Sequence, residues 1–263
     1  MKSNRIILMI IVSAGLLFTS CEKVIDLNLN TSSAAIIIQG NIFDHIGPYT
    51  IKISRTVNFT GPNIFPPVTD AKVTISDNAG NSELLTQSSD GTYITSKLRG
   101  VPGRTYTLNV ETQGTVYTAS STMPYAVNID SIYFQKDIFG SGNRTVLKFK
   151  DPANVDNYYR VIEYVNDTLK TGFYIGDDRL YQGEVITFSL SSTKVTGDDP
   201  LETGTRVRLQ LECIDKSVYE YFRTTRGNNG SSNSPANPVS NISNGALGYF
   251  GACSVREASI TVP

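Results

Sequence analysis

The sequence contains no tryptophan, one histidine and only three cysteines among its 263 residues. The single histidine, His45, leaves room for few zinc sites and excludes every Ser-His-Asp or Cys-His catalytic arrangement that does not use it. The 23 basic and 24 acidic side chains nearly cancel, whereas a nucleic-acid-binding protein needs a basic face to displace counterions. The absence of tryptophan also weakens the case for a carbohydrate-binding face, although tyrosine rings can play the same part. Composition therefore argues against nucleic acid as a partner and against most metal and hydrolase chemistry.

The sequence also lacks an apolar run long enough to cross a membrane as a helix, which takes about 20 residues. Its longest apolar stretch, residues 6–18, follows a short basic segment and has the form of a secretory signal peptide. The small residues directly before Cys21 resemble the lipobox of bacterial lipoproteins, in which that cysteine is acylated. An ordinary signal with an incidental cysteine is the alternative. We predict a signal peptide over residues 1–20, a lipid on Cys21 and a lipidated tether over residues 21–34.

With Cys21 acylated, Cys213 and Cys253 remain as a pair in an oxidising compartment. Residues 205–213 alternate in the manner of a strand. This alternation predicts inward positions for Val207, Leu209, Leu211 and Cys213, and solvent-facing positions for Arg206, Arg208, Gln210 and Glu212. We favour a disulfide between Cys213 and Cys253, and two buried, unpaired thiols are the alternative.

Most of the chain consists of short alternating segments separated by turns rich in Gly, Asn and Asp, which indicates antiparallel β-structure. The expected strands are 34–42, 49–55, 71–76, 84–86, 92–95, 105–111, 116–120, 131–135, 145–150, 158–165, 170–175, 185–189 and 205–214. We predict a mainly β fold with two β-sandwich-like modules: an immunoglobulin- or transthyretin-like sandwich over residues 35–124 and a second β-rich domain over residues 125–263. Pro124 ends the first module because proline cannot extend a strand ladder.

One segment differs from this pattern. Residues 217–225 place apolar side chains at helical spacing, which predicts one short helix in the C-terminal half that packs on the core. The stripe consists of Val218, Tyr221, Phe222 and Thr225. Asp215 is in position to cap the start of this helix, and Gly227 to end it.

The candidate chemical motifs have simpler explanations. The acidic doublets Asp177-Asp178 and Asp198-Asp199 lack the spacing of a calcium loop, so we predict solvated turn residues. The three glycines of residues 245–251 do not open a helix in a βαβ unit, so we predict a bulged strand with close backbone approach rather than a dinucleotide site. His45 is predicted to be exposed and chemically idle. We expect no catalytic residue, no metal site and no cofactor.

The candidate binding residues belong to a loop, residues 227–238, that is rich in Asn, Ser, Gly and Pro. Loops on a β-sandwich commonly present binding residues. We therefore predict that Asn228, Asn229 and Asn233 are binding residues.

Several segments resemble known families. Residues 68–80, 90–93 and 103–108 resemble the transthyretin-like or carboxypeptidase-regulatory-like modules of secreted Bacteroidota proteins. Asp130-Ser131-Ile132 and Asp167-Thr168-Leu169 resemble the O-glycosylation pattern of that phylum.

Over nearly the whole mature length, the chain resembles a family of Bacteroidota outer-membrane lipoproteins known only as a domain of unknown function and often encoded beside TonB-dependent receptors. The resemblance rests on residues 21–27, Asp151-Pro152, residues 157–160 and residues 238–252. It implies a lipid-anchored protein at the cell surface that acts, without enzymatic activity, as an accessory or ligand-binding subunit of a TonB-dependent transporter. The alternative is a structural surface subunit, similar to the β-sandwich lipoprotein pilins.

Overall fold

The computed structural model describes residues 34–57, 64–136, 143–192, 200–227 and 237–263. Ala34–Pro263 forms one compact unit, in which short strands alternate with turns and the described residues include one helix. The predicted mainly β fold with a single short helix in the C-terminal half is confirmed.

Most strands coincide with the segments that alternate polar and apolar residues, whereas the strand over residues 86–89 and the extension of the last strand over residues 252–261 were not predicted. Before residue 124 they are β1 (Ile36–Phe43), β2 (Thr50–Arg55), β3 (Lys72–Asp77), β4 (Ser82–Leu84), β5 (Thr86–Ser89), β6 (Thr92–Ile94), β7 (Thr105–Thr112) and β8 (Thr115–Thr122). The later elements are β9 (Ser131–Lys136), β10 (Asn143–Lys150), β11 (Tyr158–Val165), β12 (Thr168–Asp177), β13 (Val185–Ser192), β14 (Arg206–Ile214), the helix α2 (Lys216–Gly227) and β15 (Leu247–Thr261).

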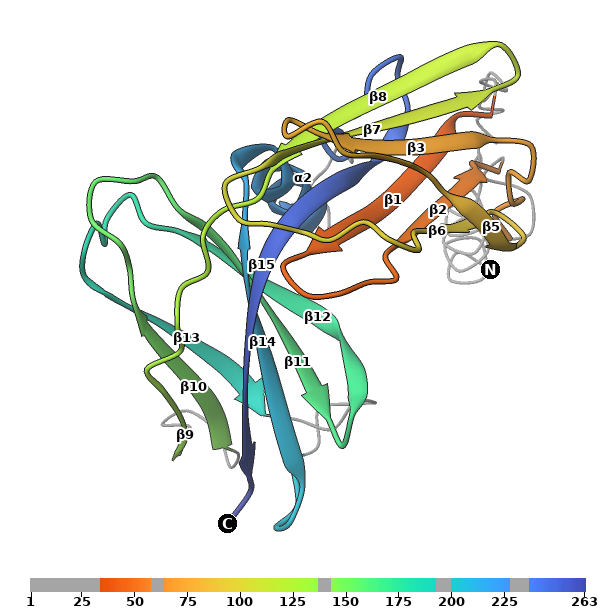
Figure 1. The fold of residues 1–263 in the computed structure, drawn as a ribbon. Coiled ribbons are helices and arrows are strands. Elements are labelled where there is room, and N and C mark those ends of the chain that lie inside the picture. The colour runs from red at the N-terminus through yellow and green to blue at the C-terminus, as the bar shows by residue number, and fades with distance from the viewer. Residues whose placement is uncertain (1–33, 58–63, 137–142, 193–199, 228–236) are drawn as a thin grey trace, which may run out of the picture. The chain divides into compact units, whose positions relative to one another are not determined.

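The strands form three sheets, and the largest runs through both halves of the described chain (Figure 1). Its eight strands follow the order β12-β11-β14-β15-β1-β2-β6-β5. A four-stranded sheet, β4-β3-β7-β8, packs on the β1 and β2 end, and a three-stranded sheet, β13-β10-β9, packs on the β11 and β14 end. The two sandwich-like modules therefore share the eight-stranded sheet as one of their two layers.

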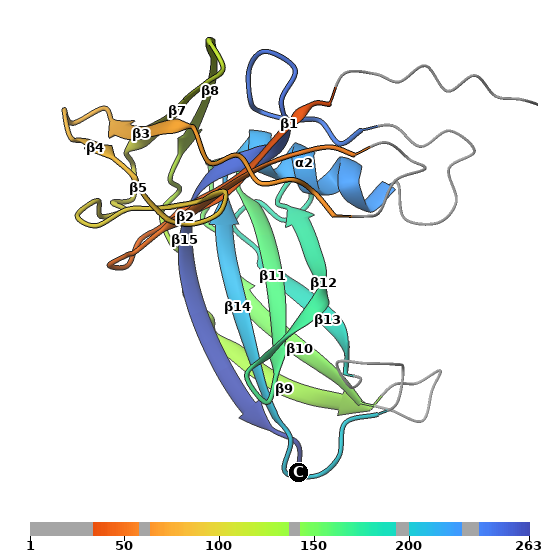
Figure 2. The ribbon, with the colours of Figure 1, turned by 90° about the vertical axis from the view of Figure 1, so that its right-hand side faces the viewer.

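Strand β15 is the element that makes this sheet continuous. As far as Cys253 it pairs in parallel with β1, and from Ser254 onward it pairs in antiparallel register with β14. Figure 2 shows β15 running past β1 and then along β14. Strand β15 therefore completes a sheet that contains β1, the first strand of the described residues, and it crosses the boundary predicted between residues 35–124 and 125–263. That division stays a prediction.

The close pairing of β15 with β1 depends on Gly248. Its φ is +95°, a left-handed conformation that L side chains rarely adopt, and a Cβ built there would lie 2.0 Å from the carbonyl oxygen of Ile38. The predicted strand with close backbone approach over residues 245–251 is confirmed at this position.

Two apolar cores lie between the sheets. The first includes Ile38, Ile51, Ile75, Leu108 and Phe250, each fully buried. The second includes Leu147, Phe149, Tyr159, Leu209 and Leu211, also fully buried. Burying a side chain of this size stabilises the fold by about 1.5–3 kcal/mol, so these two clusters dominate the stability of the described chain.

Helix α2 packs on the opposite face of the large sheet and forms a third cluster with Ile214 and Cys253. The backbone N–H of Val218 donates to Asp215 Oδ1 at 2.9 Å, which confirms the predicted cap. Tyr221 and Phe222 are buried. The predicted apolar stripe therefore faces the protein core.

The predicted disulfide between Cys213 and Cys253 is wrong. Both cysteines are free thiols, and both are buried. Cys213 lies opposite Ser254 in the ladder, so Cys213 and Cys253 point to opposite faces of the sheet. Cys213 contacts the second core, whereas Cys253 contacts the cluster under α2.

The predicted solvent-facing position of Glu212 is also wrong, because α2 covers that face of β14. Glu212 is fully buried, and its Oε2 accepts a hydrogen bond from Arg160 Nε at 2.6 Å. The Arg160 guanidinium also lies over the Phe222 ring, 4.1 Å from its centroid. The inward positions predicted for Val207, Leu209, Leu211 and Cys213 are confirmed.

Candidate functional site

Several predicted site residues lie outside the described part of the chain. They are Cys21, Asn228, Asn229, Asn233 and the doublet Asp198-Asp199. Predictions that concern them remain predictions.

The predicted exposed position of His45 is confirmed. His45 is exposed, with its ring stacked on Phe43 at a centroid distance of 5.3 Å. Ser131 and Thr168, the hydroxyl residues of the two glycosylation-like tripeptides, are exposed as well. Both hydroxyl residues are therefore accessible to a modifying enzyme.

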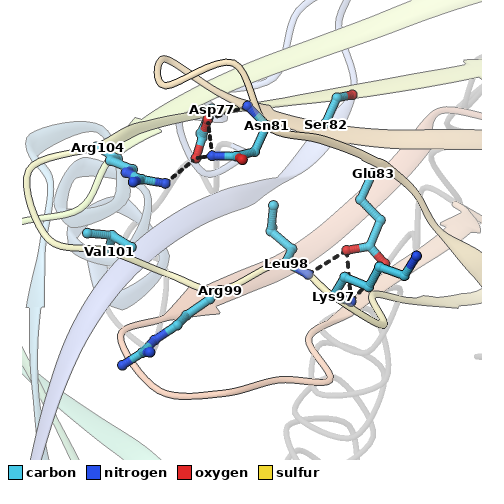
Figure 3. Close-up of a pocket in the computed structure, with 9 residues that line it drawn as sticks. All are labelled: Asp77, Asn81, Ser82, Glu83, Lys97, Leu98, Arg99, Val101 and Arg104. Carbon is cyan, nitrogen blue, oxygen red and sulfur yellow. Dashed lines mark hydrogen bonds and ion pairs between the residues drawn. The ribbon is translucent and has the colours of Figure 1, made fainter.

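A pocket of about 400 Å³ lies between the β3–β4 hairpin and the loop that precedes β7 (Figure 3). Leu98 and Val101 contribute its apolar surface, and the other lining residues are polar or charged. Those residues are Asp77, Asn81, Ser82, Glu83, Lys97, Arg99 and Arg104.

Asp77 holds the hairpin turn at one side of this pocket. Its Oδ1 accepts hydrogen bonds from the backbone N–H groups of Ala79 and Asn81, at 3.0 and 2.9 Å. Its Oδ2 accepts one from Arg104 Nη1 at 2.8 Å. Burial alone would raise the pKa of Asp77, but these hydrogen bonds, chiefly those from Asn81 and then that from Arg104, hold the pKa below its ordinary value.

Glu83 holds the loop on the other side. Its Oε1 accepts hydrogen bonds from the Ser96 N–H at 2.5 Å and the Ser96 hydroxyl at 2.8 Å, and its Oε2 accepts one from the Leu98 N–H at 2.6 Å. The Lys97 N–H lies 3.1 Å from each oxygen. Burial raises the pKa of Glu83, and the donors on this loop more than offset that effect, so the pKa lies below its ordinary value.

These contacts decide what the pocket can do. A general acid at neutral pH needs a raised pKa, whereas Asp77 and Glu83 are held ionised and are already occupied by donors of their own chain. Figure 3 shows Arg99 extending away from the two carboxylates, and both Lys97 and Arg99 are exposed. The arrangement therefore suits binding of a polar or anionic group better than proton transfer.

The prediction that Asp177-Asp178 is solvated is wrong for Asp178, which is 1% exposed. Asp178 Oδ2 accepts hydrogen bonds from the Asn157 N–H at 2.7 Å and from Gln182 Nε2 at 3.0 Å. Asp177 is mostly buried and pairs with Arg179 at 2.8 Å. The two carboxylates are structural groups that fix the turn after β12.

Asp151 makes the matching contacts from the neighbouring loop. It is 2% exposed, and it accepts hydrogen bonds from the Tyr159 hydroxyl at 2.5 Å and the Gly183 N–H at 3.2 Å. Sequence reasoning assigned no role to Asp151 or Asn157. Their only signal was that both belong to the segments that carry the family resemblance.

Neither a metal site nor a membrane helix emerges from the described residues. No group of three or more His, Cys, Asp and Glu side chains among them is placed to hold a metal ion. No helix among them is long and apolar enough to span a bilayer.

Comparison with known proteins identifies a family. One solved structure, described as "Cytokine receptor complex - Crystal form 1A", matches with a TM-score of 0.27 and 6% identity, over 86% of this chain and 95% of that chain. That likeness is too low to support an argument about function. No curated protein matches the chain. The family model described as "Domain of unknown function (DUF4249)" matches residues 22–259. The match covers most of the sequence, and the chain belongs to this family.

Proposed function

We propose that the protein is a non-enzymatic, lipid-anchored outer-membrane protein that acts as an accessory or ligand-binding subunit of a TonB-dependent transporter. The observation that carries the proposal is the position of Cys21. It directly follows the signal-peptide-like segment of residues 1–20, and the match to the family model begins at the next residue. A lipoprotein is cleaved directly before its acylated cysteine, so its mature domain is expected to follow that cysteine, as the family match does here.

The described site residues support a binding function. The carboxylates of the pocket in Figure 3 are occupied by donors from the same chain, and the buried carboxylates of Asp178 and Glu212 accept hydrogen bonds from Asn157 and Arg160. Exposed loops on a rigid β-scaffold are a common place for recognition of a ligand or partner.

The anchor is tested with the full chain produced in its own host and separated by detergent phase partition. The unmodified chain is expected in the detergent phase, and Cys21→Ser in the aqueous phase, because more than one buried acyl chain is needed for stable anchoring. Cys213→Ala is the matched control, since that thiol is buried in the fold, and it should partition as the unmodified chain does. Detergent partition of Cys21→Ser would contradict the proposal.

A further inference from the structure

The pocket in Figure 3 is lined by more positive than negative side chains. Its charged lining residues are Asp77, Glu83, Lys97, Arg99 and Arg104, so three cations face two carboxylates. Arg104 pairs with Asp77 at 2.8 Å. Among the residues that the structure describes, neither the Lys97 ammonium nor the Arg99 guanidinium forms an ion pair, although the Lys97 backbone N–H donates to Glu83. Within the described chain, the pocket therefore lacks an anionic partner for these two cations.

The segment that carries both cations is fixed in place although it lies outside the regular strands. It is residues 95–101, between β6 and β7, and we call it the cationic loop. Glu83 accepts hydrogen bonds from the N–H groups of residues 96–98. The hydroxyls of Tyr49 and Tyr106, two buried side chains, accept hydrogen bonds from the last two N–H groups of the loop, at 3.0 and 2.7 Å. A loop held in this way is ordered before a ligand arrives, so binding loses less conformational entropy.

The rest of the lining indicates what accompanies the anionic group. The apolar side chains of Leu98 and Val101 border the same pocket. Arg104 bonds to Asp77 through Nη1, and its other guanidinium nitrogens have no hydrogen-bond partner among the described residues. A planar guanidinium matches the oxygens of both carboxylate and phosphate. The cavity of about 400 Å³ lies within the range of small-molecule sites, about 300–1,000 Å³, so the ligand that fits is small and has a short apolar part.

We propose that this pocket binds a small organic anion, a carboxylate or a phosphate ester. Its charged group lies between Arg104 and the cationic loop, and its hydrocarbon part lies on Leu98 and Val101. The inference rests on the proposed ligand-binding function and names the class of ligand. Binding of such an anion needs no transporter in the assay, so failure of this inference and failure of the transporter proposal are separate observations.

The test is isothermal titration calorimetry on residues 22–263, which contain the whole compact unit Ala34–Pro263. The probes are hexanoate, hexyl phosphate and hexanamide, at low ionic strength, where charge interactions are least screened. Hexanamide has the same hydrocarbon chain without the charge. We expect saturable binding of at least one of the two anions and none of hexanamide, and the anion that binds identifies the head group.

A pair of double variants tests whether the cationic loop holds the anion. Lys97→Gln with Arg99→Gln should lower the affinity at least about tenfold, the effect expected from loss of hydrogen bonds to charged groups. Lys52→Gln with Arg206→Gln is the matched control, because it removes the same charge from exposed sites on the large sheet, and it should leave the affinity nearly unchanged. Thermal unfolding of both variants should match that of the parent.

Three results would overturn the inference. They are no saturable binding of either anion, binding of hexanamide as tight as that of the anions, and an equal loss of affinity in the two double variants. Each would show that the pocket does not recognise the anionic group through the cationic loop.

Discussion

Replacing Glu212 by glutamine should be one of the most damaging conservative changes in the described chain. The side chains of Arg160 and Glu212 are 8% and 0% exposed, and their N–O distance is 2.6 Å. The Arg160 pKa is raised: burial alone would lower it, but the Glu212 charge more than offsets that effect, so the guanidinium stays charged. Glu212→Gln keeps the shape and leaves that charge buried without its counterion. Removing one partner of such a pair costs about 3–5 kcal/mol.

The assay is urea unfolding of residues 22–263, followed by far-ultraviolet circular dichroism. Glu257→Gln is the matched control, because Glu257 pairs with Arg208 at 2.7 Å while 45% exposed, and such surface pairs contribute only about 0–1 kcal/mol. The double variant Arg160→Met, Glu212→Leu should recover most of the loss, since an apolar pair leaves no buried charge. A Glu212→Gln cost below about 1 kcal/mol, or a double variant less stable than Glu212→Gln, would refute the reasoning.

Three further predictions concern thiols, loops and acid stability. Alkylation of residues 22–263 after unfolding without reductant should modify Cys213 and Cys253, while alkylation of the folded chain should be slow, because burial raises the pKa of Cys213 to about 12. Absence of modification after unfolding would show that the two cysteines are joined in a disulfide. Deletion of residues 228–233 should hardly change the thermal midpoint, since loop length alters closure entropy weakly, and should reduce partner co-purification. Deletion of residues 78–81, in the turn between β3 and β4, should lower the midpoint, and equal midpoints for the two deletions would contradict this. Glu83→Gln should cost about 1.5–3 kcal/mol at pH 7. The folded-state pKa of Glu83 is depressed, so this stability is present above the unfolded value of about 4.3 and is lost as pH falls through the folded value. Urea midpoints that differ equally at pH 7 and pH 3 would contradict this.

Local pattern was enough to predict most elements of the fold. Alternation located most strands but not β5 or the part of β15 after Gly251, and the Val218, Tyr221 and Phe222 stripe with Asp215 before it located α2. These signals are local because side-chain direction repeats every two residues in a strand and every 3.6 in a helix.

Features that depend on distant pairing could not be predicted. The pairing of β1 with β15 joins the two ends of the described chain, and no short-range pattern encodes it. Glu212 looked solvent-facing because polar and apolar residues alternate along β14. Only the position of α2 shows that the polar face of this strand is covered. The disulfide argument failed for the same reason, since the register of Cys213 with Ser254 decides which face Cys253 occupies. Asp178 looked like a turn residue, and the backbone donor that its carboxylate accepts, the Asn157 N–H, comes from another loop.

The central claim is that this chain works as a subunit of a TonB-dependent transporter. The most direct test is to isolate the full chain from outer membranes in mild detergent, through a tag placed after Pro263, and to quantify every protein that co-purifies. The account predicts one TonB-dependent receptor in near-equal amount to the tagged chain. Recovery of the chain alone, or as a ladder of its own copies, would contradict the account, and the ladder would favour the structural-subunit alternative.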